Sequence, residues 1–350
     1  MKIGWRGALG FVLSAAFLVW TLSEVSFAQV WDVLRHSSLP LFLLSTVAAT
    51  IIFPLRALRW RVILESVARD IPLGALWRST AIGMMVNNVV PARAGELARA
   101  YAITKEDSRV NFAAAFASLA VDRIFDAVIV VLLLVIAMLF SNFPDGTTIG
   151  GQPIHRAAIL AGVVAVGALS ALVTMALSPT VVVRLWNAVI GRIAPRYAER
   201  GRALLESFMS GLGALRSPGR FARVFAWGVV MWLFTALSFW IGFKAVGIEA
   251  PFSASLVLMG VIAVGVAIPS SPGFFGVFEF FAVEGLRLYG VPPELAVSWA
   301  IGYHLLSFLP ITFIGLYYFG KLGMTFRDLG KGDQATVEPM TTPVAPAATP

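Results

Sequence analysis

The stretch VAIPSSPGFFGVFEFF, residues 266–281, breaks an otherwise apolar segment of the chain. It contains the helix breakers Pro269, Pro272, Gly273 and Gly276, and a carboxylate, Glu279, follows the last of them. Backbone groups that leave a helix inside a lipid bilayer find no water to bind, so they must face protein or a polar cavity. The stretch therefore predicts an interrupted membrane segment whose freed backbone groups face protein or a polar cavity.

The composition around this stretch is that of a polytopic membrane protein. Of the 350 residues, 58% are hydrophobic and only 13% are charged, and the mean hydropathy is +0.83. A soluble domain is about half apolar and about a quarter charged. The chain has no cysteine, which excludes disulfides and thiolate metal sites. Its three histidines, His36, His155 and His304, are far apart, and we expect no metal and no cofactor.

Six stretches are long and apolar enough to be spanning helices, which need about 20 residues. They are residues 7–27, 38–55, 113–140, 157–178, 224–243 and 295–319. The first ends in SFAQ, which also resembles a signal-peptidase site after Ala28, so a retained anchor and a cleaved signal are both open. The length of this run, and the next span close behind it, favour the anchor.

A second interrupted segment precedes the first one in the chain. Residues 73–103 have a break from Pro91 to Gly95 with Glu96 directly after it, as residues 252–288 have theirs before Glu279. Each half of the chain then reads span, span, broken hairpin, span. We therefore expect one membrane repeat over residues 1–140 and a second over 141–325, followed by a disordered tail over 326–350.

Basic residues set the expected orientation, because cytoplasmic loops are enriched in Lys and Arg. They gather in a 56–70 loop, after the first hairpin, in a 179–223 loop and near the C-terminus; the 56–70 set is Arg56, Arg59, Arg61 and Arg69. This pattern predicts cytoplasmic N- and C-termini in a bacterial inner membrane, and membrane lipids rather than nucleic acid as partners. The 181–216 region is expected to be amphipathic and to lie at the interface.

An odd number of spans separates the two hairpins, so they would enter the membrane from opposite sides. The predicted fold is an all-α polytopic membrane protein with two inverted repeats, each of three spanning helices and one re-entrant hairpin. Interrupted helices in inverted repeats are a recurring transporter architecture, in which half-helix ends face a substrate at the midplane.

The first break offers candidate headgroup ligands. The sequence PARAGELAR contains Arg93, Glu96 and Arg99, and the last two share a face if the second half of the hairpin is helical. Guanidinium groups suit phosphate because they present several donors in one plane. An internal salt-bridge cluster that anchors the hairpin is the alternative, and the sequence leaves both open.

Glu96 and the charged residues inside the following spans are candidates for charge balance or proton transfer. Asp122 and Asp126 lie one helical turn apart with Arg123 between them. A charge in mid-span is costly and needs a partner, so Asp122 either pairs with an arginine or couples to a proton or cation. In the second half, Glu279 is either a proton relay or the partner of His304.

These motifs resemble the family that includes the transmembrane domain of lysylphosphatidylglycerol synthases. Its Pro-x-Arg-x-Gly-Glu-x-x-Arg pattern is matched by Pro91, Arg93, Gly95, Glu96 and Arg99, its acidic-Arg-x-x-Asp pattern by Asp122, Arg123 and Asp126, and its second break by Pro272, Gly273, Gly276 and Glu279. Phe274 stands where the family often has glycine, and His304 where arginine is common. The resemblance covers roughly residues 5–325.

The resemblance implies movement of a lipid between leaflets. We expect a flippase or transporter for an anionic or polyprenyl lipid, with Arg93, Arg99 and Arg123 at the headgroup phosphate. Two other functions stay open: a membrane-embedded lipid-modifying enzyme, and a non-catalytic subunit that works with envelope-lipid synthesis enzymes. The aminoacyl-transfer domain of the full synthases has no counterpart in these residues, and we assign no catalytic residue.

Overall fold

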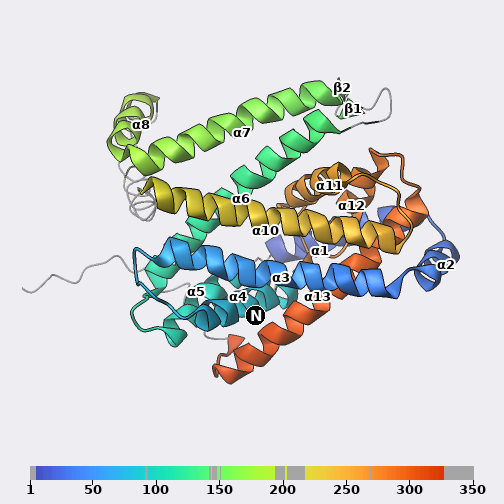
Figure 1. The fold of residues 1–350 in the computed structure, drawn as a ribbon, viewed down its shortest axis with the longest axis horizontal. Coiled ribbons are helices and arrows are strands. Elements are labelled where there is room, and N and C mark those ends of the chain that lie inside the picture. Colours follow the sequence, from blue (N-terminus) through green and yellow to red (C-terminus); the bar gives the residue numbers. More distant parts are fainter. Residues whose placement is uncertain are drawn as a thin grey trace, which may run out of the picture.

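The computed structural model describes residues 5–90, 94–141, 143, 148–149, 151–193, 202, 217–268 and 270–326. Within these ranges the chain is almost entirely helical (Figure 1). The helices of the first half are α1 (Trp5–Ser23), α2 (Phe27–His36), α3 (Leu39–Leu64), α4 (Leu73–Val89), α5 (Gly95–Glu106) and α6 (Phe112–Phe140). Those of the second half are α7 (Ile154–Leu177), α8 (Pro179–Ile193), α10 (Pro218–Ala245), α11 (Phe252–Gly265), α12 (Val277–Arg287) and α13 (Pro293–Lys321). Between the halves, β1 (Thr148–Ile149) pairs with β2 (Gln152–Pro153) in a small antiparallel ribbon.

Four helices in the described part of the chain are long and apolar enough to cross a membrane. They are α3, α6, α10 and α13, and α1 with α2, which are bent by 80° at their junction, make a fifth if the bent pair is one span. Each coincides with a stretch that the sequence predicts as spanning, and α7 occupies the sixth such stretch. The prediction of an all-helical, multi-pass membrane protein is confirmed.

The predicted end of the second span is wrong. The sequence pattern predicted an end at residue 55, with Arg56 and Arg59 in a cytoplasmic loop, but α3 continues to Leu64. Pro54 lies inside this helix and does not end it. Both arginines are therefore buried on α3, with the whole residue 7% exposed at Arg56 and 0% at Arg59. Partners on a neighbouring helix, described below, let these charges stay inside the fold.

The sequence analysis also did not predict α2. Its N-terminus is fixed by a capping box, in which the Ser26 hydroxyl accepts from the Gln29 backbone N–H at 3.2 Å and the Ser26 N–H donates to Gln29 Oε1 at 2.8 Å. The aromatic rings of Phe27 and Trp31 are exposed. A short capped helix thus stands between α1 and α3, at the same place in the first half as α8 has in the second.

The helices are interrupted at both predicted breaks, and polar side chains accept from backbone N–H groups beside them. At the first, the Gly95 N–H donates to Asn87 Oδ1 at 2.8 Å, as expected for an asparagine before a break. At the second, a short 3₁₀ turn, η3 (Pro272–Phe274), separates α11 from α12, and Gly273 and Gly276 have φ of 68° and 86°, a region that L side chains disfavour. Pro91, Arg93 and Pro269, named as breakers or ligands, lie outside the described residues.

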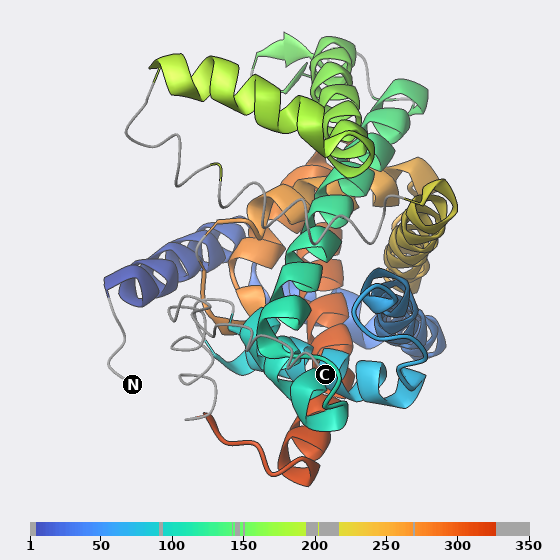
Figure 2. The same ribbon diagram turned by 90° about the vertical axis from the view of Figure 1, so that its left-hand side faces the viewer.

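The core forms where the two halves meet. α3 lies along α10, α4 packs against α13, and α11 packs against α6 (Figure 1). The largest fully buried side chains in this part include Trp60 of α3, Phe243 of α10 and Trp299 of α13. α7 and α8 stand away from the bundle and touch it through α6, at the top of both views (Figure 2). Of the amphipathic 181–216 region, only α8 and Arg202 fall among the described residues, and residues 327–350 lie outside them.

Candidate functional site

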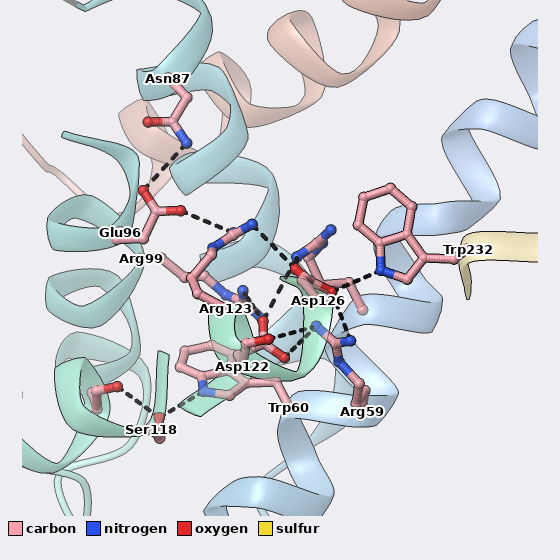
Figure 3. Close-up of polar contacts among 12 residues, drawn as sticks. Arg59, Trp60, Asn87, Glu96, Arg99, Ser118, Asp122, Arg123, Asp126 and Trp232 are labelled. Carbon is pink, nitrogen blue, oxygen red and sulfur yellow. Dashed lines mark hydrogen bonds and ion pairs between the residues drawn. The ribbon is translucent and has the colours of Figure 1, made fainter. Parts of the chain in front are cut away.

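Charged side chains from three helices meet inside the first half of the molecule (Figure 3). We call this set the arginine–carboxylate cluster; it consists of Arg56 and Arg59 of α3, Glu96 and Arg99 of α5, and Asp122, Arg123 and Asp126 of α6. The break between α4 and α5 brings the start of α5 to this place, and Asp122 lies about 15 Å from the start of α6 at 1.5 Å per residue.

The two aspartates form the centre of the cluster. Arg59 Nη2 lies 2.6 Å from Asp122 Oδ1, and Arg59 Nη1 lies 2.8 Å from Asp126 Oδ1, so this guanidinium joins both carboxylates. Arg56 Nη1 donates to Asp126 Oδ2 at 2.8 Å. The indole Nε1 of Trp232, from α10, donates to Asp126 Oδ1 at 3.0 Å. A buried carboxylate needs such partners, and the aspartates hold α3, α6 and α10 together.

The outer part of the cluster is accessible from one side. Arg123 Nη2 lies 2.9 Å from Glu96 Oε1, and its Nη1 donates to Asp126 Oδ2 at 3.3 Å. The Arg123 side chain is 42% exposed and that of Glu96 is 24% exposed. Since α6 is a candidate spanning helix, an exposed arginine here indicates a polar opening rather than lipid tails.

Two hydrogen-bond donors of Arg99 have no acceptor among the described residues. Its Nη1 donates to Asp122 Oδ2 at the long distance of 3.4 Å, and its guanidinium plane lies over the Trp60 ring at 4.1 Å. Trp60 is itself fixed by a hydrogen bond from Nε1 to Ser118 Oγ at 2.8 Å. Nε and Nη2 of Arg99 are buried and have no hydrogen-bond partner among the residues that the structure describes.

These two nitrogens form one edge of the guanidinium group, the edge that grips a carboxylate or phosphate with two parallel hydrogen bonds. Arg78 uses the same edge in this molecule, where Nε and Nη2 each donate to Glu106 at 2.6 Å. On Arg99 the edge is buried, and the guanidinium carbon lies over the Trp60 ring. This edge offers two parallel donors to an anion.

The charges of the cluster do not balance. Four guanidinium groups, of Arg56, Arg59, Arg99 and Arg123, face three carboxylates, of Glu96, Asp122 and Asp126. A surplus positive charge in a buried place is costly unless a counter-ion neutralises it. One bound anion would balance the charge of the cluster and would accept hydrogen bonds from the vacant edge of Arg99.

The second break has a different polar site, the Glu279–His304 pair. His304 Nδ1 lies 2.6 Å from Glu279 Oε1, and the other ring nitrogen, Nε2, lies 2.9 Å from the Gly273 carbonyl. The second oxygen of Glu279 accepts from the Gly276 N–H at 2.6 Å. Because Nε2 must donate to the carbonyl, one proton is shared between the carboxylate and Nδ1, and the pair is neutral overall.

Aromatic rings and α1 enclose this pair. Phe275 stacks on His304 with ring centroids 4.5 Å apart, and Phe278 lies on it at 4.4 Å. α1 packs against α12 and its Ser14 hydroxyl accepts from the Ser271 N–H at 2.8 Å. The side chains of Glu279 and His304 are only 4% and 9% exposed.

The structure brings most of the predicted site residues together. Glu96, Arg99, Asp122, Arg123 and Asp126 share one cluster, and Glu279 and His304 share another. Asp122 does pair with Arg99 of the first hairpin, but its shortest contact is with Arg59 of α3. Within the described ranges, no group of three His, Cys, Asp or Glu residues could hold a metal ion.

Sequence reasoning missed Arg56 and Arg59 as site residues. A signal was present, because their three-residue spacing puts both on one helical face. The apolar run predicts a span that ends at residue 55, and the basic side chains after it suggested a cytoplasmic loop.

The chain was compared with known proteins. It matches the family described as the lysylphosphatidylglycerol synthase transmembrane region over residues 7–315. It is 27% identical over 318 residues to the glycosyltransferase AglD of Haloferax volcanii, which covers 83% of this chain but only 50% of that protein. It is also 23% identical over 336 residues to a UPF0104 membrane protein of Methanothermobacter thermautotrophicus, covering 90% of this chain and 96% of the relative.

The likeness to AglD thus spans half of that protein's length, whereas the likeness to the UPF0104 protein is nearly end to end. The match over residues 7–315 includes both broken hairpins, the arginine–carboxylate cluster and the Glu279–His304 pair. This chain belongs to the family of the lysylphosphatidylglycerol synthase transmembrane region.

Proposed function

We propose that this protein is a transporter that moves a phosphate-bearing lipid between the leaflets of the cytoplasmic membrane. The substrate class is an anionic or polyprenyl lipid, whose headgroup passes the arginine–carboxylate cluster while its hydrocarbon chains stay in the bilayer. The termini would lie in the cytoplasm, in keeping with the basic loops.

The observation that carries the proposal is the vacant edge of Arg99 in a cluster with one surplus positive charge. A lipid phosphate would supply both the missing hydrogen-bond acceptors and the missing negative charge. Arg123 would meet the headgroup first, because its side chain is the most exposed of the four arginines of the cluster. Arg93, which lies outside the described residues, is retained as a third headgroup ligand on the sequence pattern alone.

Alternating access needs two gates, and we propose that the two broken hairpins serve as these gates in inverted repeats. The packing of the helices supports this: α4 contacts α13 as α11 contacts α6, and α3 contacts α13 as α10 contacts α6. A twofold axis that relates the two halves would map the first contact of each pair onto the second. Glu279 and His304, with one shared proton, would couple the second hairpin to a proton.

A transport assay tests the proposal. Proteoliposomes would contain headgroup-labelled phosphatidylglycerol, phosphatidylethanolamine or polyprenyl phosphate, and a membrane-impermeant quencher would report the fraction of label in the outer leaflet over time. Wild type should move at least one of these lipids. Arg99→Gln, which removes the vacant edge but keeps a polar side chain, should slow the movement by about tenfold or more, since a bidentate charged contact is lost.

The matched control is Arg184→Gln, which removes an exposed arginine from α8, outside the cluster. It should leave the rate unchanged. Equal rates in wild type and Arg99→Gln would reject the cluster as the headgroup site. Mass spectrometry of the same lipids separates the other functions: a new lipid product would identify an enzyme, and an intact protein that neither moves nor changes any lipid would favour the subunit of a synthesis complex.

A further inference from the structure

A charged cavity lies outside the arginine–carboxylate cluster. It has a volume of ≈ 310 Å³ and is lined by Arg61, Glu65, Arg69, Asp70 and Arg220. These residues come from the last turn of α3, the connection between α3 and α4, and the first turn of α10. We call it the α3–α10 pocket.

The two faces of α3 carry separate arginines. Arg59 points inward to the aspartates of the cluster, whereas Arg61, two residues or about 200° further around the helix, is exposed and faces the pocket. The α3–α10 pocket is therefore not a part of the arginine–carboxylate cluster, and its arginines can be replaced without changing Arg59 or Asp122.

Not all of the charges that line the pocket are paired. Glu65 accepts from Arg223 at 2.9 and 3.1 Å and lies 3.4 Å from Arg220, so this carboxylate is already engaged. The guanidinium groups of Arg61 and Arg69 make no ion pair or hydrogen bond to any residue that the structure describes. The carbonyl of Arg69 accepts from Arg109 at 3.1 Å, which fixes the backbone of the connection while leaving the Arg69 side chain unengaged.

The pocket lies at the depth of lipid headgroups. α3 has 26 residues and α10 has 28, so at 1.5 Å per residue each is about 40 Å long. The hydrocarbon core is about 30 Å thick, and the ends of these helices therefore reach the headgroup region. The anion present in quantity at that depth is the lipid phosphate, and juxtamembrane arginine clusters attract anionic lipids.

We propose that the α3–α10 pocket binds the phosphate group of an anionic membrane lipid through Arg61 and Arg69. The bound lipid joins the C-terminal end of α3 to the N-terminal end of α10, beside the point where Arg220 and Arg223 already hold Glu65. This proposal rests on the membrane location of the chain and not on transport, so it stands or falls separately from the proposed function.

The absence of cysteine from the chain allows a local readout. Ser66, exposed between Glu65 and Arg69, would be changed by Ser66→Cys and labelled with an environment-sensitive fluorophore on the full-length protein in detergent. Phosphatidylglycerol is then titrated, with phosphatidylcholine as the net-neutral lipid and inorganic phosphate as the free anion. A saturable fluorescence change with phosphatidylglycerol is expected, and a much weaker response to phosphatidylcholine.

The test variant is Arg61→Gln/Arg69→Gln, and the matched control is Arg184→Gln/Arg192→Gln, which removes two exposed arginines from α8 instead. The test variant should bind phosphatidylglycerol about tenfold or more weakly, since two charged contacts are lost, while the control keeps the wild-type affinity. The cluster arginine variant Arg99→Gln should also leave this signal unchanged, which separates the pocket from the transport site.

Two results would overturn the proposal: an equal loss of affinity in both double variants, which would mean that the arginines act only as general surface charge, or no change in either. Binding of inorganic phosphate as tight as that of the lipid would keep the phosphate site and move its ligand from the bilayer to solution. Thermal unfolding of each variant shows whether it is folded, because Arg61 and Arg69 are exposed and their replacement should not disturb packing.

Discussion

The break between α4 and α5 and the break between α11 and α12 occupy the same position in the two halves of the chain, but different polar groups fill them. The first leads into a cluster of four arginines and three carboxylates with the Arg99 edge vacant. The second holds one carboxylate and one imidazole whose hydrogen-bonding groups are all engaged. The first site therefore has one surplus positive charge and two donors without an acceptor in the described part of the chain, whereas each polar atom of the second site has a hydrogen-bond partner.

Access to the two sites differs as well. Glu96 and Arg123 of the first are partly exposed, while Glu279 and His304 lie under aromatic rings and α1. α7, which has the place of α1 in the second half of the chain, packs against α6 and not against the first hairpin. In this structure the first site is partly exposed, whereas the first helix covers the second, and we call them the open site and the shut site.

Removing a carboxylate from the open site should have the largest effect on stability. Asp122→Asn leaves four guanidinium groups facing two carboxylates in a buried place, and loss of one partner of a buried ion pair costs about 3–5 kcal/mol. We expect a much lower unfolding temperature in detergent. The control is Asp32→Asn, which removes a carboxylate from the exposed Arg35–Asp32 pair and should change stability little. A small effect of Asp122→Asn would mean that water, not protein, solvates the cluster.

Displacing α1 from the shut site should have the next largest effect. At Gly276 φ is 86°, and an added Cβ would lie 2.0 Å from the Ser14 carbonyl oxygen of α1. Gly276→Ala should therefore push α1 away, in addition to a backbone strain of about 1–3 kcal/mol. Gly290→Ala is the matched control, because its φ is 68° but nothing lies within 4 Å of the added atom.

Limited proteolysis and the unfolding temperature measure this difference between the glycines. Gly276→Ala should expose α1 to protease and lower stability more than Gly290→Ala. Equal effects of the two substitutions would show that the contact between α1 and the hairpin contributes nothing beyond backbone strain.

The smallest effect is expected from Glu279→Gln. With its oxygen accepting from the Gly276 N–H, the amide can place its NH2 group opposite His304 Nδ1 and donate to that nitrogen, so stability should fall by only about 1 kcal/mol. It cannot carry the shared proton, however. If the pair couples transport to protons, the variant should fold but lose the dependence of transport on a pH gradient. An unchanged dependence on the gradient would remove the pair from the coupling mechanism.

Much of this architecture could be predicted from the sequence. Apolar runs located every long helix, although α3 continues to Leu64, well past the predicted end of its span at residue 55, and the Pro and Gly clusters located both breaks. The shared face of Glu96 and Arg99 also followed from spacing, because one residue step fixes a direction on a helix. The pairing of Glu279 with His304 was one of two alternatives that the sequence left open, and the structure shows the contact. The inverted relation of the two halves stays a prediction.

Tertiary contacts decided what the sequence could not. Arg56 and Arg59 look like the basic end of a span, and only the aspartates of α6 make their burial tolerable. The vacant edge of Arg99 depends on the position of Trp60, two helices away in the chain. α1 covers the second hairpin through Ser14, a residue with no distinguishing pattern around it.

The central claim is that the vacant edge of Arg99 receives a lipid phosphate. The most direct test is an experimental structure of the protein in nanodiscs that contain the transported lipid. The account predicts phosphate density within hydrogen-bond distance of Arg99 Nε and Nη2, with Trp60 still beneath the guanidinium. An Arg99 edge occupied by Asp122 or by another side chain, with lipid phosphate only elsewhere in the protein, would contradict it.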